Sequence, residues 1–237
     1  MASTKSKILV LGGTGPAGLC LLRELAYRNH ATIVYARTPS KIPPELASSP
    51  LIEILQGELQ DRLTLSTAVA DCSTIISLLG PNINDKNIDP NIFAEFYITC
   101  LFPLMREYRV RRIFAMGTLS IKRDMDSWTI GSAVAVAFVR LFASGVFQTM
   151  QNIANAFDKQ AHDIDWTVFR ITSIPGGSDE ASWKIDRNDG KPFTGWIGDK
   201  GWTFSQKRAA LTKWLVDAVE DGEADWIGKM PAVSRLG

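Results

Sequence analysis

The sequence has few of the residues that build metal and disulfide sites. It contains two histidines and three cysteines among 237 residues. The cysteines (Cys20, Cys72 and Cys100) are far apart and form no C-x-x-C pair. We therefore expect free thiols in a reducing compartment, with neither disulfides nor a metal centre. These absences predict a cytoplasmic protein.

An excess of charge is also lacking. Lys and Arg number 26, Asp and Glu number 25, and the formal net charge is +1. No basic run stands out, so the charge pattern gives no reason to expect a nucleic-acid partner. The hydrophobic content of 46% and charged content of 22% are typical of a globular α/β protein with a sizeable core. We expect a single domain over residues 1–237.

No uninterrupted apolar run reaches the length of a membrane span, which needs about 20 apolar residues. Residues 130–147 come nearest, but Arg140, Gly131 and Gly145 interrupt them. We expect a long helix over residues 132–160, partly buried in the fold or at a subunit contact. A homodimer is therefore a candidate assembly, and membrane-surface association is the alternative. Residues 1–7 lead directly into a strand, which argues against a secretory signal.

A glycine-rich turn stands between the first predicted strand and the first predicted helix. Residues 8–11 are a short apolar run typical of a buried strand. Gly13, Gly15 and Gly18 then satisfy G-x-G-x-x-G, and an amphipathic helix follows. Such glycines allow a tight turn, close approach to a pyrophosphate and close helix packing. Strand, turn and helix in this order predict a dinucleotide site at the helix N-terminus, with a glycine turn without ligand as the alternative.

A basic residue ends the second predicted strand, residues 31–36. An acidic residue at this position would bind the ribose 2′-hydroxyl of NAD, but the sequence has Arg37, followed by Thr38 and Lys41. A guanidinium group offers a planar, bidentate fork to phosphate oxygens. The pattern therefore favours NADP(H) over NAD(H), and a solvated basic loop is the alternative.

Strands and helices alternate along most of the chain. Further strands are predicted at residues 51–55, 74–79, 112–116 and 165–171, with helices at 62–70, 91–108 and 205–219. This alternation predicts a Rossmann-like, doubly wound parallel sheet with helices on both faces. The pattern breaks at residues 172–204, which we expect to form a long, aromatic-rich loop after the sixth strand. The C-terminal tail could add a short last strand.

The glycine turn and the strand ends together resemble a known family. KILVLGGTGPAG, IISLLGP, RRIFAMGTLS and DWTVFRITSIPGG occur in the order found in atypical short-chain dehydrogenase/reductases. The most similar subgroup is the NmrA-like and biliverdin-reductase-B-like NAD(P)H-binding proteins. The resemblance covers most of the chain, and with Thr38 and Lys41 from the charge pattern it implies cofactor contacts from seventeen residues. They are Gly12, Gly13, Thr14, Gly15, Pro16, Ala17, Gly18, Arg37, Thr38, Lys41, Glu58, Leu59, Leu79, Gly80, Pro81, Met116 and Gly117.

The usual acid of the wider superfamily is missing. None of the four tyrosines has a lysine four residues later, so no Tyr-x-x-x-Lys pair is available to protonate a carbonyl. Thr118 and Ser120 follow the fifth strand, where the resemblance places an active-site hydroxyl. A hydroxyl can orient a carbonyl but is a poor proton donor near neutral pH. Either solvent supplies the proton or a conjugated acceptor takes hydride at carbon; capping of the turn is the alternative role for Thr118.

The aromatic residues of the loop at 172–204 are the expected substrate wall. Trp183, Trp196 and Trp202 would offer broad, stiff and mostly apolar contacts, unless they fill a small core beneath the loop. The sequence thus predicts an NADPH-dependent reductase of a hydrophobic aromatic or conjugated molecule. An NmrA-like regulatory protein that senses NADP(H), and a non-redox isomerase or cyclase on the same scaffold, are the alternatives.

Overall fold

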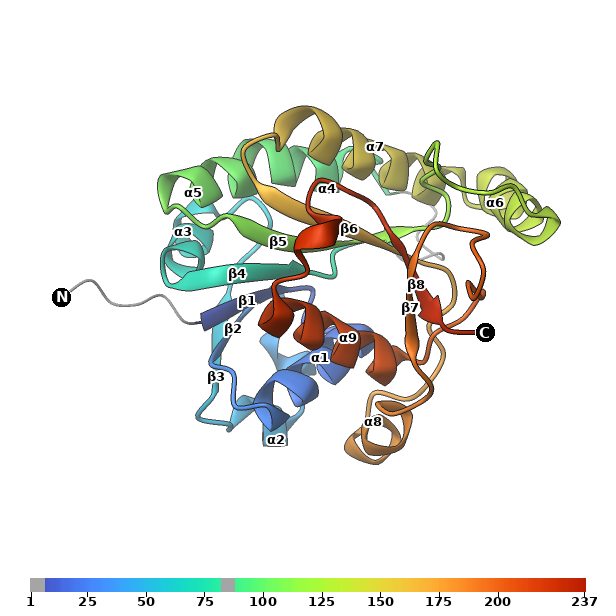
Figure 1. The fold of residues 1–237 in the computed structure, drawn as a ribbon. Helices are drawn as coiled ribbons and strands as arrows, with labels where there is room; N and C mark the ends of the chain where they lie inside the picture. Colours follow the sequence, from blue (N-terminus) through green and yellow to red (C-terminus); the bar gives the residue numbers. More distant parts are fainter. Residues whose placement is uncertain (1–6, 82–87) are drawn as a thin grey trace.

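The fold is built on one sheet of eight strands in the part of the chain described by the computed structural model, residues 7–81 and 88–237 (Figure 1). The strands are β1 (Lys7–Leu11), β2 (Thr32–Ala36), β3 (Ile52–Gln56), β4 (Cys72–Ser77), β5 (Arg112–Thr118), β6 (Asp165–Ile171), β7 (Pro192–Gly195) and β8 (Ala232–Arg235). Their order across the sheet is β3-β2-β1-β4-β5-β6-β8-β7. Neighbouring strands are parallel except for β7, which pairs antiparallel with β8. The predicted Rossmann-like sheet is confirmed.

Helices cover both faces of this sheet. The α-helices are α1 (Pro16–Tyr27), α2 (Pro44–Ala47), α3 (Arg62–Ala70), α4 (Ile92–Glu95), α5 (Phe102–Glu107), α6 (Ile130–Phe142), α7 (Ser144–Gln160), α8 (Glu180–Asp186) and α9 (Arg208–Asp221). Short 3-10 turns lie at η1 (Pro39–Lys41) and η3 (Ala224–Trp226), and a π-helical turn, η2 (Phe96–Leu101), joins α4 to α5. Pro103 lies in the first turn of α5, where its missing N–H costs little.

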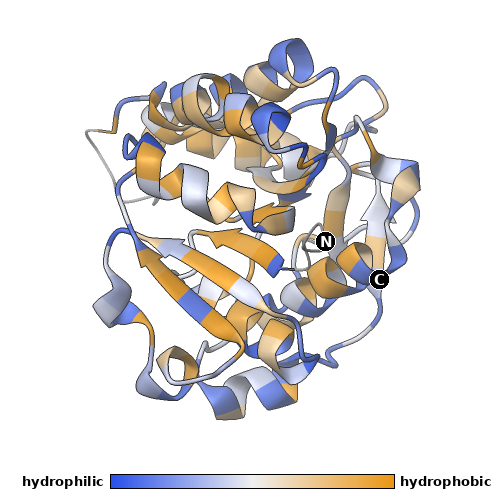
Figure 2. Cartoon of the chain, turned by 90° about the vertical axis from the view of Figure 1, so that its left-hand side faces the viewer, coloured by the Kyte–Doolittle hydropathy of each residue, from blue (hydrophilic) through white to orange (hydrophobic). Residues whose placement is uncertain are grey.

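Alternate residues of each strand point to opposite faces and enter two hydrophobic cores. In β1, Leu9 and Leu11 face the core formed with α3, α4, α5 and α7, whereas Ile8 and Val10 face the core formed with α1, α2 and α9. Figure 2 shows these strands in apolar colours between the helices. Since both faces are covered, the apolar runs that predicted the strands are explained by burial on two sides.

The predicted helix over residues 132–160 is two helices in the structure. The chain breaks at Ala143, which has the non-helical angles φ −141° and ψ 52°, and the axes of α6 and α7 differ by 112°. Ser144 and Gly145, both weak helix formers, follow the break. The expectation that the whole segment is partly buried is also wrong for α6, because none of its residues is buried.

The segment at residues 172–204 is more ordered than the predicted loop. It contains α8, whose N-cap Asp179 accepts a hydrogen bond from the backbone N–H of Ser182, and the edge strand β7. The expected last strand is present as β8 and pairs with both β6 and β7. Most of this segment is therefore part of the sheet and its helical cover.

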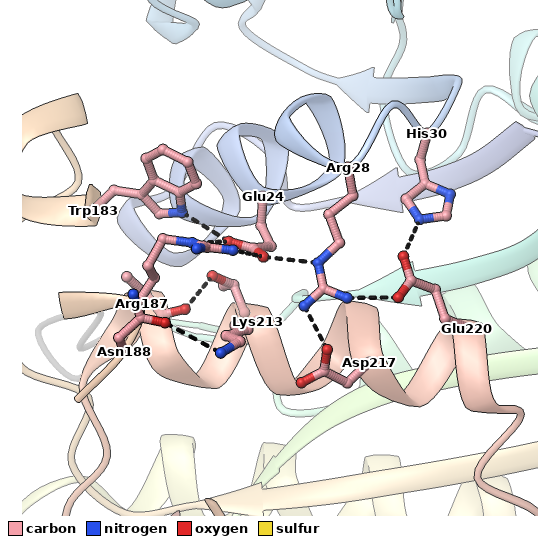
Figure 3. A network of polar contacts seen from close by, with 11 residues as sticks. Glu24, Arg28, His30, Trp183, Arg187, Asn188, Lys213, Asp217 and Glu220 are labelled. Carbon is pink, nitrogen blue, oxygen red and sulfur yellow. Dashed lines mark hydrogen bonds and ion pairs between the residues drawn. The ribbon is translucent and has the colours of Figure 1, made fainter. Parts of the chain in front are cut away.

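A buried polar network joins α8 and α9 to α1 (Figure 3). Glu24 on α1 is fully buried and accepts hydrogen bonds from the Trp183 indole, from Arg187 and from Arg28. Arg28 also pairs with Asp217 and Glu220 on α9, and Glu220 contacts His30. Because each charge has partners, the network fixes the helix that begins at the glycine turn.

Several expectations about composition can be compared with the described residues. Cys20, Cys72 and Cys100 are free thiols. Within residues 7–81 and 88–237, no group of three or more His, Cys, Asp or Glu side chains could hold a metal ion. In the same ranges no single helix is long and apolar enough to cross a membrane, although α6 and α7 pass that test as a bent pair. Residues 1–6, which bear on a secretory signal, and Asn82 lie outside the described residues.

Candidate functional site

The glycine turn brings the backbone of the β1–α1 connection close to the end of β4. Gly12 has φ +79°, and a Cβ at this position would lie 3.0 Å from the Leu78 carbonyl carbon and oxygen. A Cβ on Gly13 would lie 2.7 Å from Val34 Cγ1, and one on Gly18 would overlap the backbone of Gly12 and Gly13. These contacts explain why small residues are needed for a left-handed turn and for close packing of helix on strand.

The N-terminus of α1 is left open for a ligand. Gly15 is the N-cap and provides no side-chain hydrogen bond, and Pro16 occupies the first turn. The first amide groups of a helix have no partner within the helix, and the helix dipole places partial positive charge there. This 12-residue helix therefore presents an anion site where the sequence predicts the pyrophosphate.

A cleft of about 670 Å³ lies at the carboxyl ends of β1 to β4. Strand order reverses between β1 and β4, which is where doubly wound folds bind their ligands. The wall contains nine of the predicted cofactor residues: Gly12, Thr14, Arg37, Thr38, Lys41, Glu58, Leu59, Leu79 and Gly80. The structure thus brings together residues from four strand ends that are far apart in the sequence.

Two cations on the wall of the cleft are without carboxylate partners. Arg37 and Lys41 are exposed, and among the described residues neither forms an ion pair within 4.0 Å. Other arginines of the chain behave differently, as Arg106 does in its bidentate pair with Asp163. The two charges are therefore available to an anionic ligand in the cleft.

Tyr35 on β2 shapes another part of the wall. Its hydroxyl donates to the Glu58 carbonyl oxygen at 2.7 Å, and the Asp61 carbonyl oxygen lies 3.2 Å away. Burial, with smaller contributions from nearby carboxylates, raises the pKa of Tyr35 to about 12, so the hydroxyl stays protonated and can donate. Gly57 packs directly on the tyrosine ring, where a Cβ would collide. Tyr35 thus positions the turn after β3 that faces the cleft.

The predicted active-site hydroxyls lie together at the end of β5. Thr118 Oγ1 and Ser120 Oγ are 2.7 Å apart, and Ser120 is buried. The Ile121 N–H donates to the Thr118 carbonyl, and Gln151 on α7 donates to the Ser120 carbonyl oxygen at 2.7 Å. The turn is therefore held by the backbone and by Gln151, and the expected capping role is not needed from the Thr118 hydroxyl.

The other predicted cofactor residues are not on the wall of the cleft. Gly13 and Gly18 pack against strand and turn, as described above, and Met116 lies beside Gly80, whose Cβ position is 3.3 Å from Met116 Cε. Gly117 packs where a Cβ would be 2.9 Å from Val168 Cγ1. The remaining residues of this group are Gly15, Pro16, Ala17 and Pro81.

The three tryptophans predicted to contact substrate do not form one wall. Trp183 is buried in a small cluster with Cys20 and Ala209, and its indole N–H donates to Glu24. This placement does not fit a substrate contact and agrees with the alternative of a small core beneath the segment. Trp196 stacks edge-on against Trp226 at 5.5 Å.

Trp202 lies elsewhere again. Its ring packs on Phe204 at 4.5 Å, and Phe204 in turn contacts Gly131 at the start of α6. Neither Trp196 nor Trp202 lines the cleft at β1 to β4. If these two residues contact substrate, they do so on the side of the β5–α6 connection.

Sequence reasoning missed several residues of the cleft wall: Leu11, Tyr35, Ala36, Gly57, Gln60, Ile88, Ile92 and Phe93. Most of them adjoin predicted strand ends, so extending each predicted site by one or two residues would have found them. Ile92 and Phe93 belong to α4, and no sequence motif marks them. Their position depends on how the helix after β4 folds back over the cleft.

Comparison with known proteins agrees with this geometry. The model of the NAD(P)H-binding family matches residues 12–221. A short-chain dehydrogenase/reductase from Veillonella parvula, solved in complex with NADP, has a TM-score of 0.72 at 16% identity and covers 98% of this chain and 95% of its own. An oxidoreductase from Lactococcus lactis has a TM-score of 0.70 at 14% identity, covering 98% and 91%. At these identities the likeness shows the fold.

Curated relatives match a shorter part of the chain. An isoflavone reductase homologue from Zea mays is 36% identical over 86 residues, which are 34% of this chain and 28% of the relative. Phenylcoumaran benzylic ether reductase 1 from Arabidopsis thaliana is 29% identical over 87 residues, with the same coverage. The match thus spans under a third of these relatives' length. Together with the open helix terminus and the cleft, the family match over most of the chain shows that this protein belongs to the NAD(P)H-binding family.

Proposed function

We propose that this protein is an NADPH-dependent reductase of a hydrophobic, aromatic or conjugated small molecule. One observation carries the choice of cofactor: Arg37 and Lys41 line the cleft at the end of β2 and have no carboxylate partner among the described residues. A 2′-phosphate on the adenosine ribose would meet both cations and the Thr38 hydroxyl. Arg37 would bind its oxygens through a bidentate fork, and Lys41 would add a second charge.

The residues of the cleft fit the rest of the dinucleotide in the same orientation. The pyrophosphate would meet the N-terminus of α1, and the backbone of Gly12 allows its close approach. The ends of β4 and β5, with Gly80 and Met116, would then receive the nicotinamide. When bound, the cofactor supplies hydride, and the protein contributes orientation and exclusion of water.

The hydroxyls at the end of β5 would act on the acceptor. In this proposal Thr118 donates a hydrogen bond to an acceptor oxygen, and Ser120, 2.7 Å away, orients the Thr118 hydroxyl. Without a Tyr-x-x-x-Lys pair, the proton comes from solvent, or a conjugated acceptor takes hydride at carbon. Such chemistry suits an extended aromatic or conjugated molecule, and the names of the Zea mays and Arabidopsis thaliana relatives describe reductases.

Calorimetric titration tests the choice of cofactor. We expect Arg37→Asp to weaken NADPH binding by about 10- to 150-fold, since a hydrogen bond to a charged group contributes about 1.5–3 kcal/mol. NADH binding should change little. Arg62→Asp, on the exposed start of α3 away from the cleft, is the matched control and should alter neither affinity. Equal losses for NADPH and NADH in Arg37→Asp would contradict the proposal.

Turnover tests the reductase. NADPH consumption is followed with quinones, flavins and conjugated ketones, and Thr118→Val should lower kcat for the accepted substrate with little change in NADPH affinity. Tight NADPH binding without turnover of any acceptor would instead support the regulatory alternative. Unchanged kcat in Thr118→Val would show that the hydroxyl does not orient the acceptor.

A further inference from the structure

An unpartnered apolar surface covers α6 and the connection that precedes it. α6 lies at the outer end of the molecule, beyond α7 and on the side where β5 and β6 end (Figure 1). None of its residues is buried. Seven large apolar side chains of this region are 56% to 76% exposed, and we call them the α6 patch: Met125, Trp128, Ile130, Val134, Phe138, Leu141 and Phe142.

The size of the α6 patch matches one side of a protein interface. Seven side chains of this size and exposure amount to roughly 800 Å² of apolar surface, because a single aromatic residue buries about 150–250 Å². The largest patch on a monomer is typically about 300–600 Å². A stable protein–protein interface buries about 800 Å² on each partner. The patch is therefore large enough to form a stable dimer.

The spacing of the patch fits a second copy of α6 running antiparallel. Ile130, Val134, Phe138 and Phe142 recur at intervals of four residues and share one side of the helix. A two-fold axis midway between Val134 and Phe138 would place each of them against the other residue of the second copy. Ile130 would likewise meet Phe142. An isologous contact of this kind needs no second surface on the molecule.

Charge also favours a second copy. Arg140 is the one charged residue of α6, and its guanidinium lies over the Phe147 ring at 5.9 Å. Around the axis described above, the two arginines would be about 12 Å apart along the helices at 1.5 Å per residue. This exceeds the Debye length of about 8 Å at physiological salt, so their repulsion is screened. A helix lying on a membrane instead has several Lys or Arg residues on its polar face.

We propose that the α6 patch is a homodimer interface in which two α6 helices pack antiparallel about a two-fold axis near Val134 and Phe138. The interface would cover the side chains that the fold of one chain leaves in water. Its formation requires no bound cofactor, so it stands independently of the reductase proposed above.

Sedimentation of the full chain tests the dimer. We expect the unmodified protein to have twice the chain mass of 26.1 kDa at micromolar concentration. Phe138→Glu should raise the Kd of dimerisation about thirtyfold or more, the effect of losing a central interface residue. Leu63→Glu is the matched control, because Leu63 on α3 is 83% exposed and lies on another part of the molecule. It should leave the mass unchanged.

Mixing of variants tests the register. Val134→Lys alone and Phe138→Glu alone should each be largely monomeric, whereas their equimolar mixture should recover a dimer, because the lysine of one chain faces the glutamate of the other. NADPH titration and thermal melting verify that each variant is folded. A monomeric unmodified protein, a Leu63→Glu variant that dissociates equally, or a mixture that stays monomeric would overturn the proposal. So would a monomer that sediments with phosphatidylserine-containing vesicles through the α6 patch.

Discussion

Gly12 is the residue at which backbone conformation and binding depend most directly on the lack of a side chain. We expect Gly12→Ala to lower the free energy of unfolding by about 1–3 kcal/mol and to weaken NADPH binding, since φ is +79° and the added Cβ would press on the Leu78 carbonyl at 3.0 Å. Gly228→Ala is a matched control with φ +70° and no atom within 4 Å of the added Cβ. Urea unfolding and calorimetry give both quantities, and equal effects of the two variants would contradict the role of the close contact.

Tyr35 offers a second test at the same scale. Its hydroxyl holds the Glu58 carbonyl, and Phe keeps the ring on which Gly57 packs. We expect Tyr35→Phe to weaken NADPH binding about threefold to tenfold, the value of one neutral hydrogen bond. Tyr27→Phe, at an exposed tyrosine on α1, should have no effect on binding. If both variants bind NADPH like the unmodified protein, the turn after β3 does not need this hydrogen bond.

At the scale of elements, Arg170 on β6 joins three segments beside the proposed active site. Its guanidinium is fully buried, donates to the Ile121 and Met230 carbonyls, and forms a bidentate pair with Asp126. Asp126 also accepts the backbone N–H of Ile197. The β5–α6 connection, the end of β7 and the approach to β8 are therefore fixed to one strand.

This ion pair predicts a pH dependence of stability. Burial alone would raise the pKa of Asp126, but the hydrogen bonds and charge of Arg170, with the backbone N–H groups of Arg123 and Ile197, hold it below its usual range. The unfolded chain therefore binds this proton at higher pH, near the ordinary value of about 4. The stabilisation is present above that pH and is lost as the pH falls towards the lower pKa of the folded state.

We expect Asp126→Asn to lower the free energy of unfolding at pH 7 by about 3–5 kcal/mol, because it leaves the buried Arg170 without its counter-charge. The variant should also lose less stability than the unmodified protein between pH 5 and 3. Asp163→Asn removes an exposed bidentate partner of Arg106 and should cost under about 1 kcal/mol at pH 7, since solvent screens the pair. Urea unfolding at each pH measures both, and similar losses at pH 7 would show that burial of Arg170 does not matter.

For the molecule as a whole, the sequence predicted the parts that depend on local pattern. The apolar runs identified the strands, and residues 62–70 and 165–171 have the predicted bounds. The glycine turn and Arg37 meet in one cleft because parallel strands end at the same edge of the sheet. Local chemistry and topology together were sufficient for this half of the site.

The remaining features depend on contacts between distant parts of the chain. Apolar residues continue through Ala143 without a proline, so the sharp break between α6 and α7 has no clear pattern in the sequence. Trp183 lies in an aromatic segment, but its environment depends on Glu24, which is 159 residues away. The break and the buried tryptophan therefore required the three-dimensional structure.

A crystal structure of the protein with NADP⁺ tests the central claim most directly. We expect the pyrophosphate at the N-terminus of α1 and the 2′-phosphate oxygens within about 2.7–3.2 Å of the Arg37 guanidinium nitrogens. A dinucleotide bound in the cleft with its 2′-phosphate directed away from Arg37 and Lys41, or bound outside the cleft, would contradict it.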